Sequence, residues 1–185
     1  MTEFNEPIRD ITQAKVYFQT MGCSHFHMSR EYPERYNEYK SKNISKSQEQ
    51  EWTKESFLAI KDQIVDQHSN EEYLWSRHSE MVVLAKSLKS EEAVKFVRLA
   101  TLQIIDRLHP KSCLLVAETI IGRQHIEYRD GMIFLAYDLS LKDIAKEFSD
   151  VALQLVARAK QRQCDPPRCD KAQKDCNRIV KHLGI

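Results

Sequence analysis

Apolar residues return every three or four positions along most of this chain, which is the spacing of one face of an α-helix. The longest unbroken stripe predicts a helix over residues 141–159 and consists of Leu141, Ile144, Ala145, Phe148, Ala152, Leu155, Val156 and Ala159. Helix breakers are rare, because the 185 residues include only four glycines and five prolines. The pattern therefore predicts an all-α, single-domain bundle of about six or seven helices.

Capping residues indicate where the middle helices begin. Ser45 or Ser47 can accept a hydrogen bond from the first turn of a helix that runs to about residue 67, and Asn70 can do the same for a helix that runs to about residue 88. Ser90 is followed by two glutamates, which suit the positive end of a helix dipole. The helix after Ser90 is apolar on two sides and ends at His109, so we expect it to be the central helix.

The first 43 residues differ from the rest, because they are polar, rich in aromatic side chains and only weakly periodic. A first helix is expected near Ile11 to Met21, and Pro33 suits the first position of a short second helix. A last helix is expected from about Asp170 to Leu183. We therefore predict that residues 1–43 form an aromatic-rich segment that packs on a helical domain of residues 44–185.

The region between residues 112 and 137 allows two interpretations. Residues 113–121 can form a buried helix that ends at Gly122, or a buried strand. Asp130 and Gly131 stand between two apolar segments, which is typical of the turn of a β-hairpin. Because a lone hairpin is only marginally stable, a helix-turn-helix arrangement is preferred, and a small β-hairpin near residues 124–137 is the alternative.

Charge and cysteine content narrow the class of protein. With 28 basic and 27 acidic residues the formal net charge is +1, so the chain as a whole lacks the charge excess of a nucleic-acid-binding protein. Its longest apolar run, Met132 to Tyr137, is too short to cross a bilayer, and the first residues do not read as a secretory signal. Five cysteines leave one over in any set of disulfides. We therefore expect reduced thiols, a cytoplasmic location and no membrane association.

Two groups of residues offer soft or borderline metal ligands. Cys23, His25 and His27 alternate in one short stretch, and three more thiols lie toward the other end of the chain: Cys164, Cys169 and Cys176. Structural zinc needs four such ligands, usually with a close Cys-x2-Cys pair, and the sequence has no such pair. The hypothesis is a zinc or iron site, shared by the two groups if the fold brings them together. Buried, reduced thiols that act as small hydrophobes are the alternative.

Cys23 is also the candidate nucleophile for thiol chemistry, because His25 or His27 could supply the base that forms a thiolate. Other catalytic motifs are absent from the sequence. There is no Glu-x-x-His for a carboxylate-bridged iron pair, no His-Glu-x-x-His, no Gly-x-Ser-x-Gly and no glycine-rich phosphate loop. These residues give neither a substrate nor a reaction, so the sequence leaves open whether the protein is an enzyme.

Two features could bind nucleic acid. Residues 139–148 and 151–162 could be the two helices of a DNA-binding helix-turn-helix, but the second is apolar where a groove-reading helix should be polar, so one continuous core helix fits better. Residues 158–182 contain eight lysines and arginines against three aspartates. Such an excess is more often a solvated helix face than a phosphate-binding patch.

A face of tyrosines is the candidate protein-binding surface. Tyr32, Tyr36 and Tyr39 fall on one side of the helix expected at Pro33, with Arg35 beside them. Tyrosine and arginine are frequent hot spots of interfaces, although packing in the core is the more common role of such aromatics. We therefore expect a protein-interaction or regulatory module that binds a protein partner or a second copy of itself. A metal- or thiol-dependent enzyme or sensor and a nucleic-acid binder are the alternatives.

Overall fold

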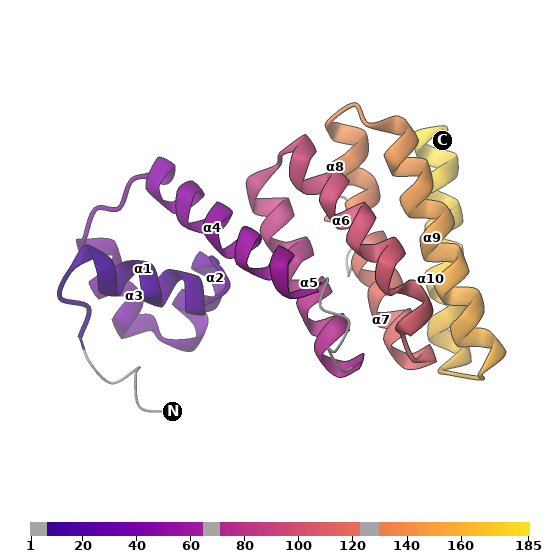
Figure 1. The fold of residues 1–185 in the computed structure, drawn as a ribbon, viewed down its shortest axis with the longest axis horizontal. Coiled ribbons are helices and arrows are strands. Elements are labelled where there is room, and N and C mark those ends of the chain that lie inside the picture. The colour runs from indigo at the N-terminus through magenta and orange to yellow at the C-terminus, as the bar shows by residue number, and fades with distance from the viewer. Residues whose placement is uncertain (1–6, 65–70, 123–129) are drawn as a thin grey trace. The chain divides into compact units, whose positions relative to one another are not determined.

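The computed structural model describes residues 7–64, 71–122 and 130–185, and these ranges are helical with no β-strand (Figure 1). The prediction of an all-α protein is confirmed. The described ranges hold ten α-helices and one short 3-10 helix, where about six or seven helices were expected. The count differs because α2 (His25–Glu31) and α8 (Met132–Asp138), at seven residues each, are too short to show a repeating stripe.

The chain forms two compact units, Met1–Ala59 and Ile60–Ile185. The division falls within α4 (Lys46–Ile64), so the first unit contains sixteen residues more than the aromatic-rich segment of residues 1–43. Each unit contains one of the two tryptophans, Trp52 in the first and Trp75 in the second. That residues 1–43 pack on a domain of residues 44–185 stays a prediction.

The helices of the first unit begin where the sequence supplies a cap. Asp10 accepts a hydrogen bond from the backbone N–H of Gln13, 2.8 Å away, and so caps α1 (Ile11–Thr20). Ser24 caps α2 in the same way. Pro33 opens α3 (Pro33–Ser41), as predicted, and Ser45 accepts from the N–H of Gln48 at the start of α4.

Aromatic rings build the core of the first unit. The ring of Phe18 stacks on that of Tyr39 with centroids 5.9 Å apart, and it meets the ring of Trp52 at 6.0 Å in a tilted arrangement. Tyr17 is buried beside them and contacts Tyr39. A unit of this size has few core positions, so large rings bury the apolar area that a larger domain would bury with many aliphatic side chains.

The second unit is a helical bundle around α7 (Pro110–Ile121). This helix packs most extensively against α9 (Lys142–Gln161) and also contacts α5 (Glu71–Leu88), α8 and α10 (Pro166–Leu183). Ser90 caps α6 (Glu91–Ile104) as predicted, and η1 (Ile105–Arg107) follows. The expected cap at Asn70 lies outside the described residues.

The central helix is therefore α7 rather than α6. The first apolar face of α6 is buried, but Leu99 and Leu102 on its second face are exposed to solvent. By contrast, most of α7 is buried, including Cys113, Val116, Ala117 and Ile120. Apolar residues on two sides of a helix thus do not show that neighbours cover both sides, since one apolar face of α6 is exposed.

The stripe on α9 behaves as predicted, since its members from Ala145 to Ala159 are buried. The helix runs from Lys142 to Gln161 without interruption. No turn separates residues 139–148 from 151–162, so the interpretation as a DNA-binding helix-turn-helix is wrong, and one continuous core helix is confirmed.

The Asp130–Gly131 signal marks the start of a helix, not a hairpin turn. Residues 132–138 form α8, so the hairpin alternative is wrong for its second strand, and the residues of its first strand, 124–129, lie outside the described residues. A Cβ added to Gly131 would lie 2.3 Å from the carbonyl oxygen of Ile121 at the end of α7. The glycine therefore allows a close backbone approach, and Gly122, at φ +103°, ends α7 as expected.

Among the described residues, no helix combines the length and the apolar character needed to cross a membrane.

Candidate functional site

His25 is the centre of a hydrogen-bonded cluster in the first unit. It is the first residue of α2, which the Ser24 cap fixes in place. Its Nδ1 lies 3.2 Å from the hydroxyl oxygen of Tyr36 on α3, and its Nε2 lies 3.0 Å from Oε1 of Glu49 on α4. Three helices thus contribute one polar side chain each to a continuous chain of contacts.

Tyr39 completes the cluster from the buried side. Its hydroxyl donates a hydrogen bond of 2.7 Å to the same Oε1 of Glu49. Burial disfavours the phenolate, and the hydrogen bond and negative charge of Glu49 disfavour it further, so the pKa of Tyr39 is raised far above its ordinary value. Tyr39 therefore keeps its proton and acts as a fixed donor that holds the Glu49 carboxylate.

The hydrogen-bonding capacities of these groups set the direction of each bond. A carboxylate only accepts, so the Nε2 of His25 donates to Glu49. In a neutral imidazole the other nitrogen, Nδ1, then carries a lone pair and accepts from the Tyr36 hydroxyl. The order carboxylate, imidazole, hydroxyl is the one by which a histidine withdraws a proton from a nucleophile.

The cluster is walled by rings and open on one side. The rings of Phe18, Tyr36 and Tyr39 surround the imidazole of His25, with centroids 5.8, 5.8 and 6.0 Å away. The side chain of His25 is 47% exposed, whereas that of Glu49 is 17% exposed. Solutes can therefore reach the imidazole while the carboxylate that orients it stays largely shielded.

Glu49 was not among the residues proposed from the sequence. Its role depends on α4 meeting α2, which local patterns do not contain. One signal was available: Glu49 lies three residues before Trp52 on the predicted helix and so shares a face with a buried tryptophan. A carboxylate on a core-facing side of a helix indicates a partner that pairs with it.

The three N-terminal metal candidates have separate surroundings. Cys23 is buried at a left-handed φ of +54°, and its Sγ lies 3.6 Å from the hydroxyl oxygen of Ser56. His25 faces Tyr36 and Glu49, and the ring of His27 contacts that of Phe26. The side chains at positions 23, 25 and 27 do not point the same way, because α2 begins at His25 and the chain is not extended there.

The C-terminal thiols are placed mainly as core side chains. Cys169 and Cys176 are buried on α10, and Cys164 precedes that helix in a partly exposed position. The Sγ of Cys169 lies 3.0 Å from the carbonyl oxygen of Cys164, and burial raises the pKa of Cys176 to about 12. Both buried thiols therefore keep their protons at neutral pH.

In the described ranges no group of three or more His, Cys, Asp or Glu side chains is arranged to hold a metal ion. A zinc or iron site at the six candidate residues therefore stays a prediction without support from the geometry. The same is true of Cys23 as a nucleophile, because the thiol is buried.

The predicted tyrosine face divides into exposed and buried residues. Tyr32 is exposed and Tyr36 is partly buried, whereas Tyr39 belongs to the core. The guanidinium of Arg35 lies over the ring of Tyr17, 5.3 Å from its centroid. Phe26 of α2 was not singled out from the sequence, yet it is 63% exposed, and the guanidinium of Arg30 lies 5.1 Å from its ring centroid.

The basic segment of residues 158–182 is neutralised in part by ion pairs. Five of its eight basic side chains make ion pairs, which are Arg158–Asp106, Lys160–Asp170, Arg168–Glu118, Lys171–Asp175 and Arg178–Asp175. A patch that binds phosphates needs cations that are available to replace counterions. Nucleic-acid binding by this segment stays a prediction, and these pairs argue against it.

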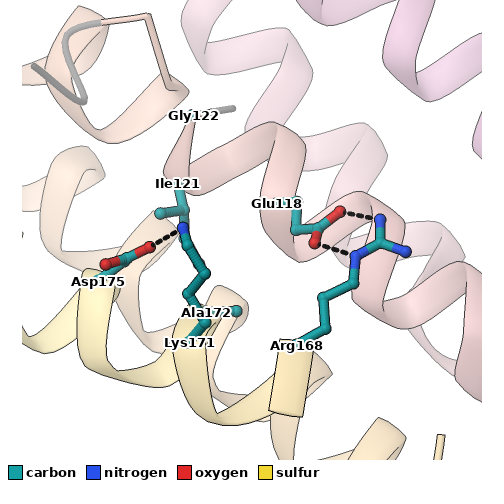
Figure 2. A pocket seen from close by; sticks show the side chains of 7 residues that line it. All are labelled: Glu118, Ile121, Gly122, Arg168, Lys171, Ala172 and Asp175. Carbon is teal, nitrogen blue, oxygen red and sulfur yellow. Dashed lines mark hydrogen bonds and ion pairs between the residues drawn. The ribbon is translucent and has the colours of Figure 1, made fainter. Parts of the chain in front are cut away.

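A pocket of about 430 Å³ lies between α7 and α10 in the second unit (Figure 2). Figure 2 shows Arg168 reaching from α10 to Glu118 on α7, while Lys171 bonds to Asp175 one turn further along α10. The two hydrogen bonds from Arg168 to Glu118 are 2.5 Å long. Ile121, Gly122 and Ala172 complete the lining. Two cations face two carboxylates, so the charges of the wall balance.

These pairs make the α7–α10 pocket a structural joint rather than a binding site for an anion. The Glu118 side chain is only 15% exposed and is bound by two guanidinium nitrogens, so an incoming anion would have to displace it. The hydrogen bonds that Arg168 donates to Glu118 raise the pKa of Arg168. The arrangement fixes α10 against α7.

Comparison of the chain with protein-family models, with curated proteins and with solved structures finds no match. The function is therefore inferred from the geometry of the described residues.

Proposed function

We propose that the protein is an interaction module and that it binds a partner protein through the surface of α2 and α3, here called the α2–α3 surface. This surface consists of Phe26, Arg30, Tyr32, Arg35 and Tyr36. The observation that carries the proposal is the exposure of Phe26, 63% of whose surface is open to water with the Arg30 guanidinium over its ring.

An exposed phenylalanine beside an arginine has the composition of an interface hot spot. Aromatic side chains and arginine dominate binding energies, because they bury a large area and pair with charges in one place. The core of this unit already contains the buried rings of Phe18, Tyr39 and Trp52, and Phe26 is not part of it. Burial of such a ring by a partner contributes about 1.5–3 kcal/mol.

The chemistry of the surface suggests the form of the partner site. An apolar pocket would take the ring of Phe26, and a carboxylate at its edge would pair with Arg30, whose side chain is 59% exposed. Glu31 now shares that guanidinium at 2.7 Å, so the partner carboxylate would compete with an exposed ion pair that is worth little.

The proposed location of the protein is the cytoplasm. The five cysteines all lie within the described residues and form no disulfide, and Cys113, Cys169 and Cys176 are among the four that are buried. Free thiols in this number are typical of a reducing compartment.

The experiment uses a photo-crosslinking phenylalanine analogue at position 26 of the full chain in cells. The control position is Val16 on α1, an exposed apolar residue of the same unit. We expect a discrete adduct from position 26 and none from position 16. Once the captured protein is purified, Phe26→Ala should weaken its affinity at least about tenfold and Val16→Ala less than about twofold.

Sedimentation of the purified chain distinguishes a second copy from a different protein. If the adduct is a homodimer, its mass is twice that of the chain and Phe26→Ala abolishes self-association. Equal affinities of the Phe26→Ala and Val16→Ala variants would refute the proposed surface.

A further inference from the structure

We propose that Tyr36 is a covalent modification site whose phenol is activated by His25, and that it accepts an acyl group from an activated acyl donor. This inference goes beyond partner binding and does not depend on it. It stands on the chain of contacts from Glu49 to His25 at 3.0 Å and from His25 to the Tyr36 hydroxyl at 3.2 Å.

The geometry places a base at the phenol and a carboxylate behind the base. Glu49 accepts the proton of Nε2, so Nδ1 of the neutral imidazole is free to take the phenol proton. Glu49 is itself held by the hydrogen bond from Tyr39, 2.7 Å long. His25 is thus the base, and Glu49 and Tyr39 are positioning residues.

Tyr36 has a cation over its ring and is open to solvent in part. The ammonium of Lys40, one turn later on α3, lies 4.8 Å from the centroid of the Tyr36 ring. The Tyr36 residue is partly exposed and the His25 side chain is 47% exposed, so the pair lies at the surface of the unit.

The step balances without a redox partner. The phenol oxygen attacks the acyl carbon, and the new O–C bond forms as the bond between that carbon and the leaving group breaks. The phenol proton passes to Nδ1 of His25 and from there to the leaving group or to water. The donor must therefore carry a good leaving group, as acyl imidazoles and thioesters do.

Tyr137 is a matched control within the same chain. It is partly buried like Tyr36, and a lysine, Lys142, lies over its ring at 5.8 Å from the centroid. In the described part of the chain no histidine makes a hydrogen bond with it. A difference in reactivity between the two tyrosines therefore reports the contribution of His25 rather than exposure or a nearby cation.

The test treats the native full chain with N-acetylimidazole and measures O-acetylation of each tyrosine by peptide mass spectrometry over time. Release by hydroxylamine verifies the phenyl ester. Because general-base catalysis contributes factors well above ten, we expect Tyr36 to react at least about tenfold faster than Tyr137. Equal rates would overturn the proposal, and this comparison needs no variant.

Variants separate a chemical role from a structural one. His25→Gln places an amide beside Glu49 but supplies no base. The O-acetylation rate of Tyr36 in this variant should therefore fall to that of Tyr137. Glu49→Gln should give an intermediate rate. His27→Gln, on the same helix but with its ring against Phe26, is the control and should react as the wild type does.

The pH–rate profile supplies the readout that packing alone would not change. The groups that face His25 are Tyr36 and Tyr39 from α3 and Glu49 from α4, with Phe18 of α1 as an apolar wall. The wild-type rate should reach a plateau as the pH rises, because catalysis by a general base saturates, whereas the His25→Gln rate should keep rising with hydroxide. Identical profiles would refute the role of His25. The assay contains no partner, so its failure leaves the proposed α2–α3 surface untouched.

Discussion

At the scale of single residues, His78 of α5 is the buried group that ties stability to pH. Its side chain is fully buried, with Nε2 2.7 Å from the hydroxyl oxygen of Thr101. That hydroxyl donates its proton to the carbonyl of Val97, so it accepts from Nε2. Nδ1 has no hydrogen-bond partner among the residues that the structure describes and would have to take up a proton in an apolar interior, which lowers the pKa of His78 to about 4.

The unfolding free energy should therefore fall as the pH falls. The unfolded chain binds a proton at an ordinary histidine pKa of about 6.5, and the folded chain does so only near 4, so the stability from neutral His78 is complete above about pH 6.5 and is lost toward pH 4. The loss amounts to roughly 3 kcal/mol at most. Urea titrations at several pH values measure it.

His78→Leu should remove this part of the pH dependence, and His182→Gln, which changes an exposed histidine on α10, should leave it in place. The wild type and the two variants have the same carboxylates, so the difference between their curves of unfolding free energy against pH gives the contribution of His78. Parallel curves for wild type and His78→Leu would show that the imidazole is not held neutral.

At the scale of elements, the ends of α7 decide how its neighbours dock. The backbone of Gly131 approaches the carbonyl of Ile121 so closely that α8 could not start there with a side chain in place. Arg168 and Glu118 join α10 to the last turn of α7 (Figure 2). Neither contact is visible in local sequence patterns, because each joins residues that are far apart in the chain or acts through the backbone.

Gly131→Ala should destabilise the protein by about 1–3 kcal/mol, because the new Cβ collides with backbone atoms that cannot rotate away. Gly184→Ala is the control: it has open space around it but a left-handed φ of +66°, so only the conformational cost of about 1 kcal/mol is expected. Thermal and urea unfolding measure both. A smaller effect at Gly131 than at Gly184 would contradict the close approach.

The Arg168–Glu118 pair should show a coupling energy of about 1 kcal/mol in a double-mutant cycle with Glu118→Gln and Arg168→Gln. The value is modest because the Arg168 side chain is 41% exposed and is screened by solvent. Glu91 and Lys95 on α6 form an exposed pair that serves as the control, with a coupling of about 0.5 kcal/mol or less. Equal couplings in the two cycles would show that burial of Glu118 adds nothing.

The elements that the sequence revealed are those with local causes. The α9 stripe, the Ser90 cap and the Pro33 start each depend on residues within one or two turns. The hairpin alternative at Gly131 was wrong because glycine serves both a tight turn and a close backbone approach, whereas the preferred helical interpretation agrees with α7 and α8. The sequence predicted only part of the His25 cluster. The histidine and the tyrosines were singled out, but the Glu49 carboxylate that orients His25 lies on another helix, α4.

At the scale of the whole molecule, burial lowers the reactivity of most of the thiols. Four of the five cysteines are buried, and the fifth, Cys164, is partly exposed. Burial also raises the pKa of Cys169 and, to about 12, that of Cys176, so these thiols stay protonated and unreactive in the folded state.

A thiol-reactive disulfide reagent should therefore modify one cysteine quickly in the native protein and all five in denaturant. Cys164→Ser should remove the fast phase, whereas Cys113→Ser should leave it unchanged, as measured by absorbance and confirmed by mass spectrometry. A fast phase that persists in Cys164→Ser would place a reactive thiol elsewhere, with Cys23 the first to examine.

The division of the tryptophans provides one more tool. Trp52 packs against Phe18 within Met1–Ala59, and Trp75 belongs to Ile60–Ile185. Trp75→Phe leaves an indole whose emission reports only the N-terminal half, and Trp52→Phe leaves one that reports only the C-terminal half. Two fluorescence melts would then show whether the halves lose their structure at the same temperature.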